Sequence, residues 1–139
     1  MAGAKGSFAS GIVSVDLPEQ QIHKAVADHL RTRGAPSLVW WHTANGMFAR
    51  GRRSRKGIAI QASKLKGLGM RAGVSDIIAV HRGRIFALEL KSKDGRASEA
   101  QLEFLNDMQR AGAFTCLAHG LDAALRALEE WRLLRGTMH

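Results

Sequence analysis

The sequence predicts an α/β fold in which helices cover both faces of a β-sheet. Helical and strand periodicities follow one another along the chain in the order α-β-β-β-α-β-α. Residues 76–91 contain two neighbouring apolar runs. Each run predicts a strand with apolar side chains on both of its faces, which is typical of a sheet buried on both faces. With 139 residues, 45% of them hydrophobic, the chain is long enough for one domain with its own core.

The first helix is expected to begin after a loose N-terminal segment. Residues 1–15 are rich in glycine, alanine and serine, so the single domain is expected to span residues 16–139. Asp16 is predicted to cap the helix, with Pro18 in its first turn and Glu19 completing a capping arrangement. The apolar stripe Ile22, Val26 and Leu30 continues the helix to about Arg33, before Gly34 and Pro36 end it.

A strand is predicted next, over residues 38–42. Its two tryptophans, Trp40 and Trp41, must point to opposite faces, and we expect both to contact the core, although one could stack on a base. Residues 44–72 contain five glycines and fit no clear pattern, apart from a short helix around residues 58–66.

A hairpin over residues 76–91 carries the most informative charges. A two-residue turn at Arg82-Gly83, where glycine suits the positive φ, sets Asp76 directly opposite Glu89. Lys91 points to the same face as Glu89. Like charges that face each other across two strands destabilise a sheet, so a cation is expected nearby to offset their repulsion. Glu-x-Lys is a common triplet, but with this register the three residues fit a divalent-metal site for phosphodiester hydrolysis.

The remaining elements are a helix, a strand and a final helix. Ser98 is predicted to start the first of these helices, with Gln101 at the capping-box position and Gly112 as its stop. Residues 114–118 form a short strand. Gly120-Leu121-Asp122 then leads into a last helix whose apolar side comprises Leu121, Leu125, Leu128 and Leu133.

The charge balance indicates a polyanionic partner. The formal net charge is +9, which suits nucleic acid or an acidic membrane surface, but no basic amphipathic helix supports membrane docking. The clustered or motif-flanking cations, taken as candidate DNA contacts, are Arg50, Arg52, Arg53, Arg55, Lys56, Lys64, Lys66, Lys93 and Arg96. A solvated loop is the simpler reading of such a run. Without an apolar span or signal peptide, and with Cys116 alone, a cytoplasmic location is expected.

Several motifs together resemble the VRR-NUC domain, a branch of the PD-(D/E)xK nuclease superfamily. They extend from about Pro18 to Trp131. The residues that carry the resemblance are Glu19-x-x-Ile22, Asn45-Gly46, Lys64-Leu65-Lys66-x-x-Gly69, Gly73-Val74-Ser75-Asp76, Glu89-Leu90-Lys91, Gly95, Ser98, Gln101 and Gly112. The sequence departs from the family at Ser75, where proline is usual, and at His23, where glutamine is common.

The resemblance implies a fold, an activity and a site. The fold is a PD-(D/E)xK restriction-endonuclease-like core (αβββαβ plus a C-terminal helix) with a mixed central sheet. The activity is Mg²⁺- or Mn²⁺-dependent cleavage of DNA, with flaps or junctions as substrates, by a stand-alone phage or bacterial homodimer. The implied site adds Glu19, the Leu90 carbonyl and Gln101 to Asp76, Glu89 and Lys91.

Other readings of the same residues stay open. Glu19 and Gln101 also fit simple helix-capping roles, and His23 fits an ordinary histidine of the helix surface better than a contact with the site. A non-catalytic DNA-binding module with the same fold is the main alternative function. An RNA-binding protein is a third class, since basic charge does not distinguish the two polymers.

Overall fold

The computed structural model describes residues 16–43 and 63–136. The elements are α2 (Glu19–Arg33), β1 (Val39–His42), β2 (Ile77–His81), β3 (Arg84–Lys91), α4 (Glu99–Arg110), β4 (Phe114–His119) and α5 (Leu121–Glu130). The four strands form one sheet in the order β1-β2-β3-β4, with β3 and β4 parallel and the other two pairs antiparallel. The predicted order of elements and the predicted mixed sheet are therefore confirmed.

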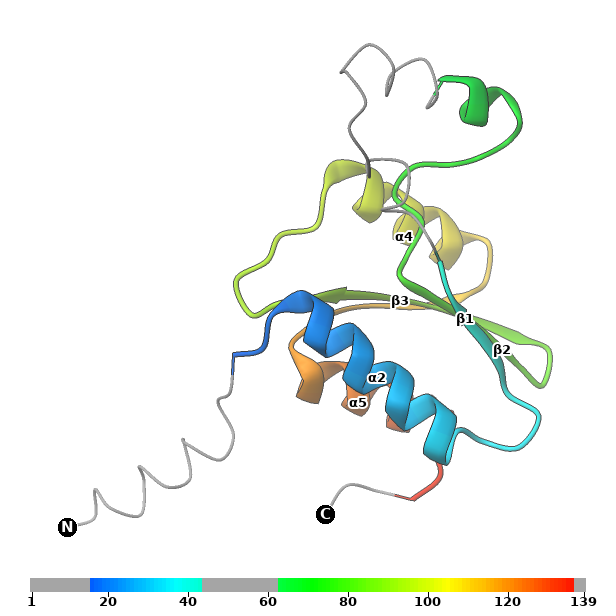
Figure 1. The fold of residues 1–139 in the computed structure, drawn as a ribbon. Helices are drawn as coiled ribbons and strands as arrows, with labels where there is room; N and C mark the ends of the chain where they lie inside the picture. Colours follow the sequence, from blue (N-terminus) through cyan, green and yellow to red (C-terminus); the bar gives the residue numbers. More distant parts are fainter. Residues whose placement is uncertain (1–15, 44–62, 137–139) are drawn as a thin grey trace.

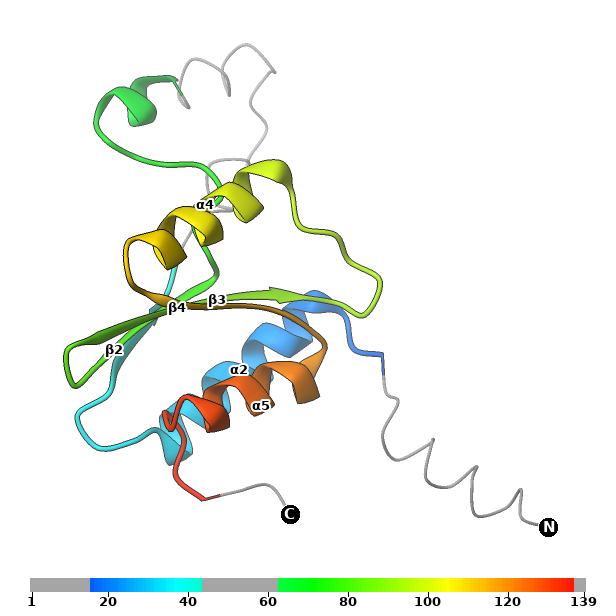
Figure 2. The same cartoon turned by 180° about the vertical axis from the view of Figure 1, so that it is seen from behind.

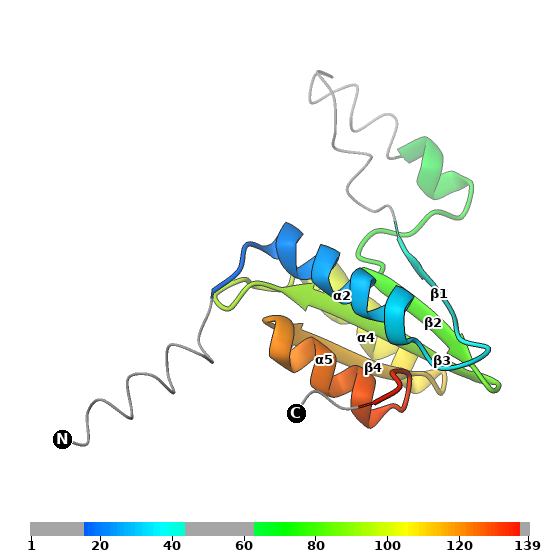
Figure 3. The same ribbon diagram turned by 60° about the horizontal axis from the view of Figure 1, so that its bottom comes forward.

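Helices cover the sheet from both sides, as the two apolar faces predicted. Helix α4 lies on one face, and α2 and α5 lie together on the other (Figure 1, and from behind in Figure 2). Figure 3, with this face of the sheet turned forward, shows α2 and α5 side by side in front of the strands. The larger core joins α2 and α5 to Ile77, Phe86 and Leu88, while Ile78 and Ala87 face α4 in the smaller one.

The β2–β3 hairpin has the predicted turn and register. Arg82 and Gly83 have φ angles of 52° and 78°, the pair of positive values that a two-residue hairpin turn requires. The pairing runs from His81 opposite Arg84 to Ile77 opposite Leu88. Continuing it by one residue sets Asp76, which directly precedes β2, opposite Glu89.

The two long helices begin in different ways. At α4, Ser98 Oγ accepts from Gln101 N at 3.1 Å and the Gln101 side chain accepts from Ser98 N at 2.8 Å, so the capping box is confirmed. The predicted Asp16 cap is wrong. Pro18 is the N-cap residue of α2 and no side chain caps this helix. Asp16 lies two residues too early to cap, and its carboxylate is instead 3.9 Å from Lys93 Nζ.

Some element ends differ from the predictions by a residue or more. Strand β1 begins at Val39 and β4 reaches His119. Helix α5 ends at Glu130, so Leu133 belongs to the core but not to the helix. Residues 63–67 form a short helix, so the C-terminal part of the helix expected at 58–66 is confirmed. The earlier part of that helix and the N-terminal segment fall in residues 44–62 and 1–15, which lie outside the described residues.

The expected burial of both tryptophans is wrong for one of them. Trp40 packs against the larger core, whereas Trp41 is 46% exposed. The reason is topological: β1 is an edge strand, and α4 packs over β3 and β4 on the Trp41 side of the sheet. In the described part of the chain, no helix is long and apolar enough to cross a bilayer.

Candidate metal centre

The predicted acidic residues meet at one end of the sheet, where β1 and β3 end and β2 begins. The segment that leads into β2 is anchored on the first turn of α4. Gly73 has φ of 78°, and a Cβ atom there would lie 2.4 Å from the Ala100 carbonyl carbon, so only glycine permits this approach. Arg71 adds an ion pair to Asp107 of α4 at 2.6 Å. These contacts position the residue that follows the segment, Asp76.

Thr43, the residue that follows β1, holds the same segment from the other side. Thr43 Oγ1 donates to the Ser75 carbonyl at 2.7 Å, and Thr43 N donates to the Asp76 carbonyl at 2.8 Å. Ser75 is completely buried, and its Oγ has no hydrogen-bond partner among the described residues. Thr43 therefore holds the backbone of Ser75 and Asp76 in place where the chain enters β2.

The buried carboxylate of Glu89 is the most unusual group in the site. Glu89 is 1% exposed, and neither of its carboxylate oxygens has a hydrogen-bond partner within the described part of the chain. Burial, and then the negative charge of Asp76, raises the pKa of Glu89 to about 8. Lys91 Nζ lies 3.6 Å from Glu89 Oε2 and lowers that pKa in part.

This arrangement fits a divalent cation. A buried carboxylate whose oxygens accept no hydrogen bond is costly, and coordination of a metal offsets that cost. Asp76 is held in place because its Oδ2 accepts from Leu90 N at 2.7 Å. In an antiparallel strand the N–H and C=O of one residue point to the same side, so the Leu90 carbonyl also faces the Asp76 side.

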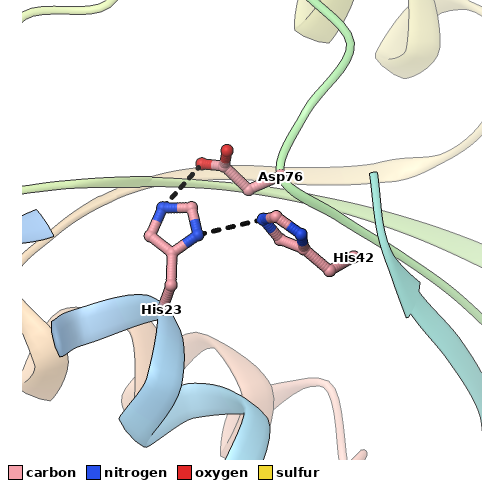
Figure 4. A group of neighbouring side chains, drawn as sticks. All are labelled: His23, His42 and Asp76. Carbon is pink, nitrogen blue, oxygen red and sulfur yellow. Dashed lines mark hydrogen bonds and ion pairs between the residues drawn. The ribbon is translucent and has the colours of Figure 1, made fainter. Parts of the chain in front are cut away.

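Two histidines, one on α2 and one on β1, lie beside Asp76 at this end of the sheet (Figure 4). His23 of α2 places Nε2 3.6 Å from Asp76 Oδ2 and 3.9 Å from Glu19 Oε2. Its Nδ1 lies 3.1 Å from Nε2 of His42, the last residue of β1. His23, His42 and Asp76 each offer a ligand atom within 4.8 Å of the others.

The expectation that His23 is an ordinary surface histidine is wrong. Its side chain is only 20% exposed and faces the acidic residues. Desolvation, and then the nearby His23, lowers the pKa of His42. His42 was missed as a site residue because nothing local marks it. The β1–β2 register, which pairs His42 with Ile77 next to Asp76, brings it there.

The other predicted residues divide into three groups. Glu19 lies near the site, because its carboxylate is 3.9 Å from His23 Nε2. The side-chain oxygen of Gln101 instead accepts from Ser98 N in the capping box. Lys64, Lys66, Lys93 and Arg96 are exposed. The basic run Arg50, Arg52, Arg53, Arg55 and Lys56 lies outside the described residues, as does Asn45-Gly46.

A basic pocket lies at the opposite end of the hairpin and was not predicted. It is lined by His81, Arg82, Arg84, Phe86, Trp131 and Arg132. Sequence patterns give little sign of it, because the turn of the hairpin and the end of α5 are far apart in the chain.

Comparison with known proteins supports the same architecture. A solved structure described as a "VRR_NUC domain protein" matches with a TM-score of 0.65 and 18% sequence identity, over 86% of this chain and 93% of that chain. The chain has the fold of that protein. The predicted resemblance is thus confirmed at the level of the fold. No family model and no curated protein matches the sequence.

Proposed function

We propose that this protein is a metal-dependent nuclease that hydrolyses phosphodiester bonds of DNA. One observation carries the proposal: Glu89 is a buried carboxylate whose oxygens have no hydrogen-bond partner in the described residues, beside Asp76 and Lys91. A buried carboxylate whose oxygens accept no hydrogen bond is costly to folding, and the ion pair with Lys91 at 3.6 Å leaves these oxygens without hydrogen bonds. Its occurrence in a nuclease-like fold supports a role in holding a cation.

Each side chain of the centre has a proposed role. The carboxylates of Asp76 and Glu89 and the carbonyl of Leu90 would hold Mg²⁺ or Mn²⁺, with Glu19 as a further acidic group. When bound, the cation supplies charge stabilisation at the phosphoryl oxygens and lowers the pKa of a water. Lys91 cannot be a ligand, since it carries the same sign of charge as the metal. It would orient the attacking water, whose pKa the cation lowers, and offset charge on the phosphate.

The rest of the proposal concerns the substrate. The net charge of +9 supports a nucleic-acid partner. Four exposed cations among the described residues are the proposed phosphate contacts: Lys64, Lys66, Lys93 and Arg96. The basic run at residues 50–56 would extend this grip, and Gln101 would contact the site from the first turn of α4. We propose flapped or branched DNA as the substrate, a homodimer as the acting form and the bacterial cell or infected host as its location.

The direct test is cleavage of linear, flapped and four-way DNA with Mg²⁺ or Mn²⁺. Asp76→Ala and Glu89→Ala should each abolish metal-dependent cleavage while the circular dichroism spectrum stays that of the wild type. Glu103→Ala, which removes an exposed carboxylate from α4, is the matched control and should cleave normally. Cleavage at the wild-type rate by either site variant would refute the site. Binding of DNA without cleavage by the wild type would favour a non-catalytic DNA-binding module.

A further inference from the structure

The nitrogen Nε2 of His23 is in an unexpected position. It is buried and has no hydrogen-bond partner among the described residues. It nevertheless lies between two acidic side chains, 3.6 Å from Asp76 Oδ2 and 3.9 Å from Glu19 Oε2. Both separations are longer than the ~3.2 Å that a good N–H···O bond allows. Ordinary hydrogen bonding therefore does not explain why an imidazole nitrogen points at this place.

The same separations suit ligands that share one metal ion. Metal–nitrogen and metal–oxygen bonds of about 2.1 Å each allow two ligand atoms of one cation to lie up to about 4.2 Å apart. The distances from His23 Nε2 to the two carboxylates are within that limit. Asp76 is already fixed by Leu90 N, and His23 is fixed by its place on α2, so little adjustment is needed on the protein side.

His42 is placed to select the tautomer of His23. Its Nε2 lies 3.1 Å from His23 Nδ1, with the two rings edge to face at 5.1 Å. When His23 Nδ1 carries the shared proton and donates it to His42, the lone pair of His23 Nε2 points toward Asp76 and Glu19. This is the usual arrangement of a metal-binding histidine, whose other ring nitrogen donates to a second group that orients it.

We propose that His23 is a nitrogen ligand of the metal centre, acting through Nε2 together with Asp76 and Glu19, with His42 as its positioning residue. The inference rests on the proposed function in using the same Asp76, but it changes the chemistry of the site. Mg²⁺ prefers oxygen ligands, whereas imidazole favours transition-metal cations such as Co²⁺ and Zn²⁺. His23 should therefore strengthen the binding of Co²⁺ or Zn²⁺ at this centre, while binding of Mg²⁺ depends on the carboxylates.

The test is metal binding in the absence of DNA, with Co²⁺ and Mg²⁺ as the probes. Isothermal titration should show that His23→Gln, which introduces the amide common in the family, weakens Co²⁺ binding by at least about tenfold. Mg²⁺ affinity should change by less than about twofold. His29→Gln replaces a histidine of the same helix whose ring accepts from Arg33, and it should leave both affinities unchanged.

Proton NMR of the Co²⁺-loaded protein identifies the ligand directly. A metal-bound imidazole gives a paramagnetically shifted, exchangeable N–H signal, which here belongs to His23 Nδ1. The signal should be present in the wild type and in His29→Gln and absent in His23→Gln. His42→Ala should keep the signal but weaken Co²⁺ binding about tenfold; His42→Gln, which retains a hydrogen-bonding group, should recover part of that loss.

The outcomes separate this inference from the proposed function. If His23→Gln keeps both the shifted signal and its Co²⁺ affinity, the nitrogen ligand is refuted, and the position of His23 is explained by its contact with His42. If the signal is lost in His42→Ala and kept in His23→Gln, His42 is the ligand and the assignment is wrong. A protein that binds Co²⁺ through His23 but cleaves no DNA would refute the nuclease and leave the ligand in place.

Discussion

The charged side chains at the two ends of the β2–β3 hairpin differ in their exposure to solvent. At the turn, Arg82 and Arg84 are exposed to solvent beside Trp131. At the other end, Glu89 and Lys91 are 1% and 9% exposed within the sheet. Charge in water needs no fixed partner, but charge in a protein interior does. The oxygens of Glu89 accept no hydrogen bond among the described residues, so we propose the metal site at the buried end.

The largest effect expected from this comparison concerns Lys91. Lys91→Ala should reduce the turnover number for DNA cleavage by at least about a hundredfold, in the range typical of a lost group that stabilises transition-state charge. Its metal affinity should change little, since a cation cannot be a metal ligand. Cleavage kinetics, together with isothermal titration of Mn²⁺, measure the two quantities separately. Lys93→Ala, an exposed neighbour, is the matched control. Normal cleavage by Lys91→Ala, or complete loss of its metal binding, would contradict the role.

A smaller effect is expected for the cations that hold DNA. On duplex DNA, log K falls with log salt by about 0.9 per phosphate contact. If the arginines 50, 52, 53 and 55 all touch phosphates, replacing them with alanine should flatten that slope by about 3 to 4 units. The double variant Arg82→Ala/Arg84→Ala, at the turn, should flatten it by less than about one unit.

Both variants are to be measured in an Asp76→Ala background, so that cleavage does not remove the DNA. A slope unchanged in the quadruple variant would make the basic run at residues 50–56 a solubility feature. The DNA path would then be sought along Lys64, Lys66, Lys93 and Arg96. A large change in the turn variant would instead make the basic pocket a DNA contact and remove the contrast between the two ends.

The sequence predicted those features that depend on residues close to one another in the chain. The hairpin register follows from a two-residue turn and strict alternation, so the facing of Asp76 and Glu89 could be worked out from residues alone. The Ser98–Gln101 capping box is equally local. The sheet topology is not local: the family resemblance implied a mixed sheet, and the structure shows that β3 and β4 are its parallel pair.

The errors have tertiary causes. The exposure of Trp41 depends on how far α4 reaches across the sheet, which no strand pattern encodes. His42 becomes a site residue through the pairing of β1 with β2, and His23 through the approach of α2 to Asp76. Asp16 shows the limit of short motifs. Its spacing to Glu19 fits a capping box, but Pro18 sets where the helix begins.

The central claim is that buried Glu89 is kept for a cation, and thermal unfolding as a function of pH tests it most directly. Because folding raises the pKa of Glu89 from 4.5 to about 8, the folded metal-free protein binds a proton that the unfolded chain has already released. Stability relative to Glu89→Gln should therefore fall as pH rises from about 4.5 to 8, by at most about 1.4 kcal/mol per pH unit, and level off above that range.

Adding Mg²⁺ or Mn²⁺ at pH 8 should reverse this difference. The wild-type melting temperature should rise with metal concentration, because the cation binds the folded state and replaces the proton of Glu89. Glu89→Gln should gain little from either metal while remaining the more stable protein without it. Equal stabilisation of both proteins by metal, or parallel pH profiles, would contradict the claim that Glu89 holds the cation.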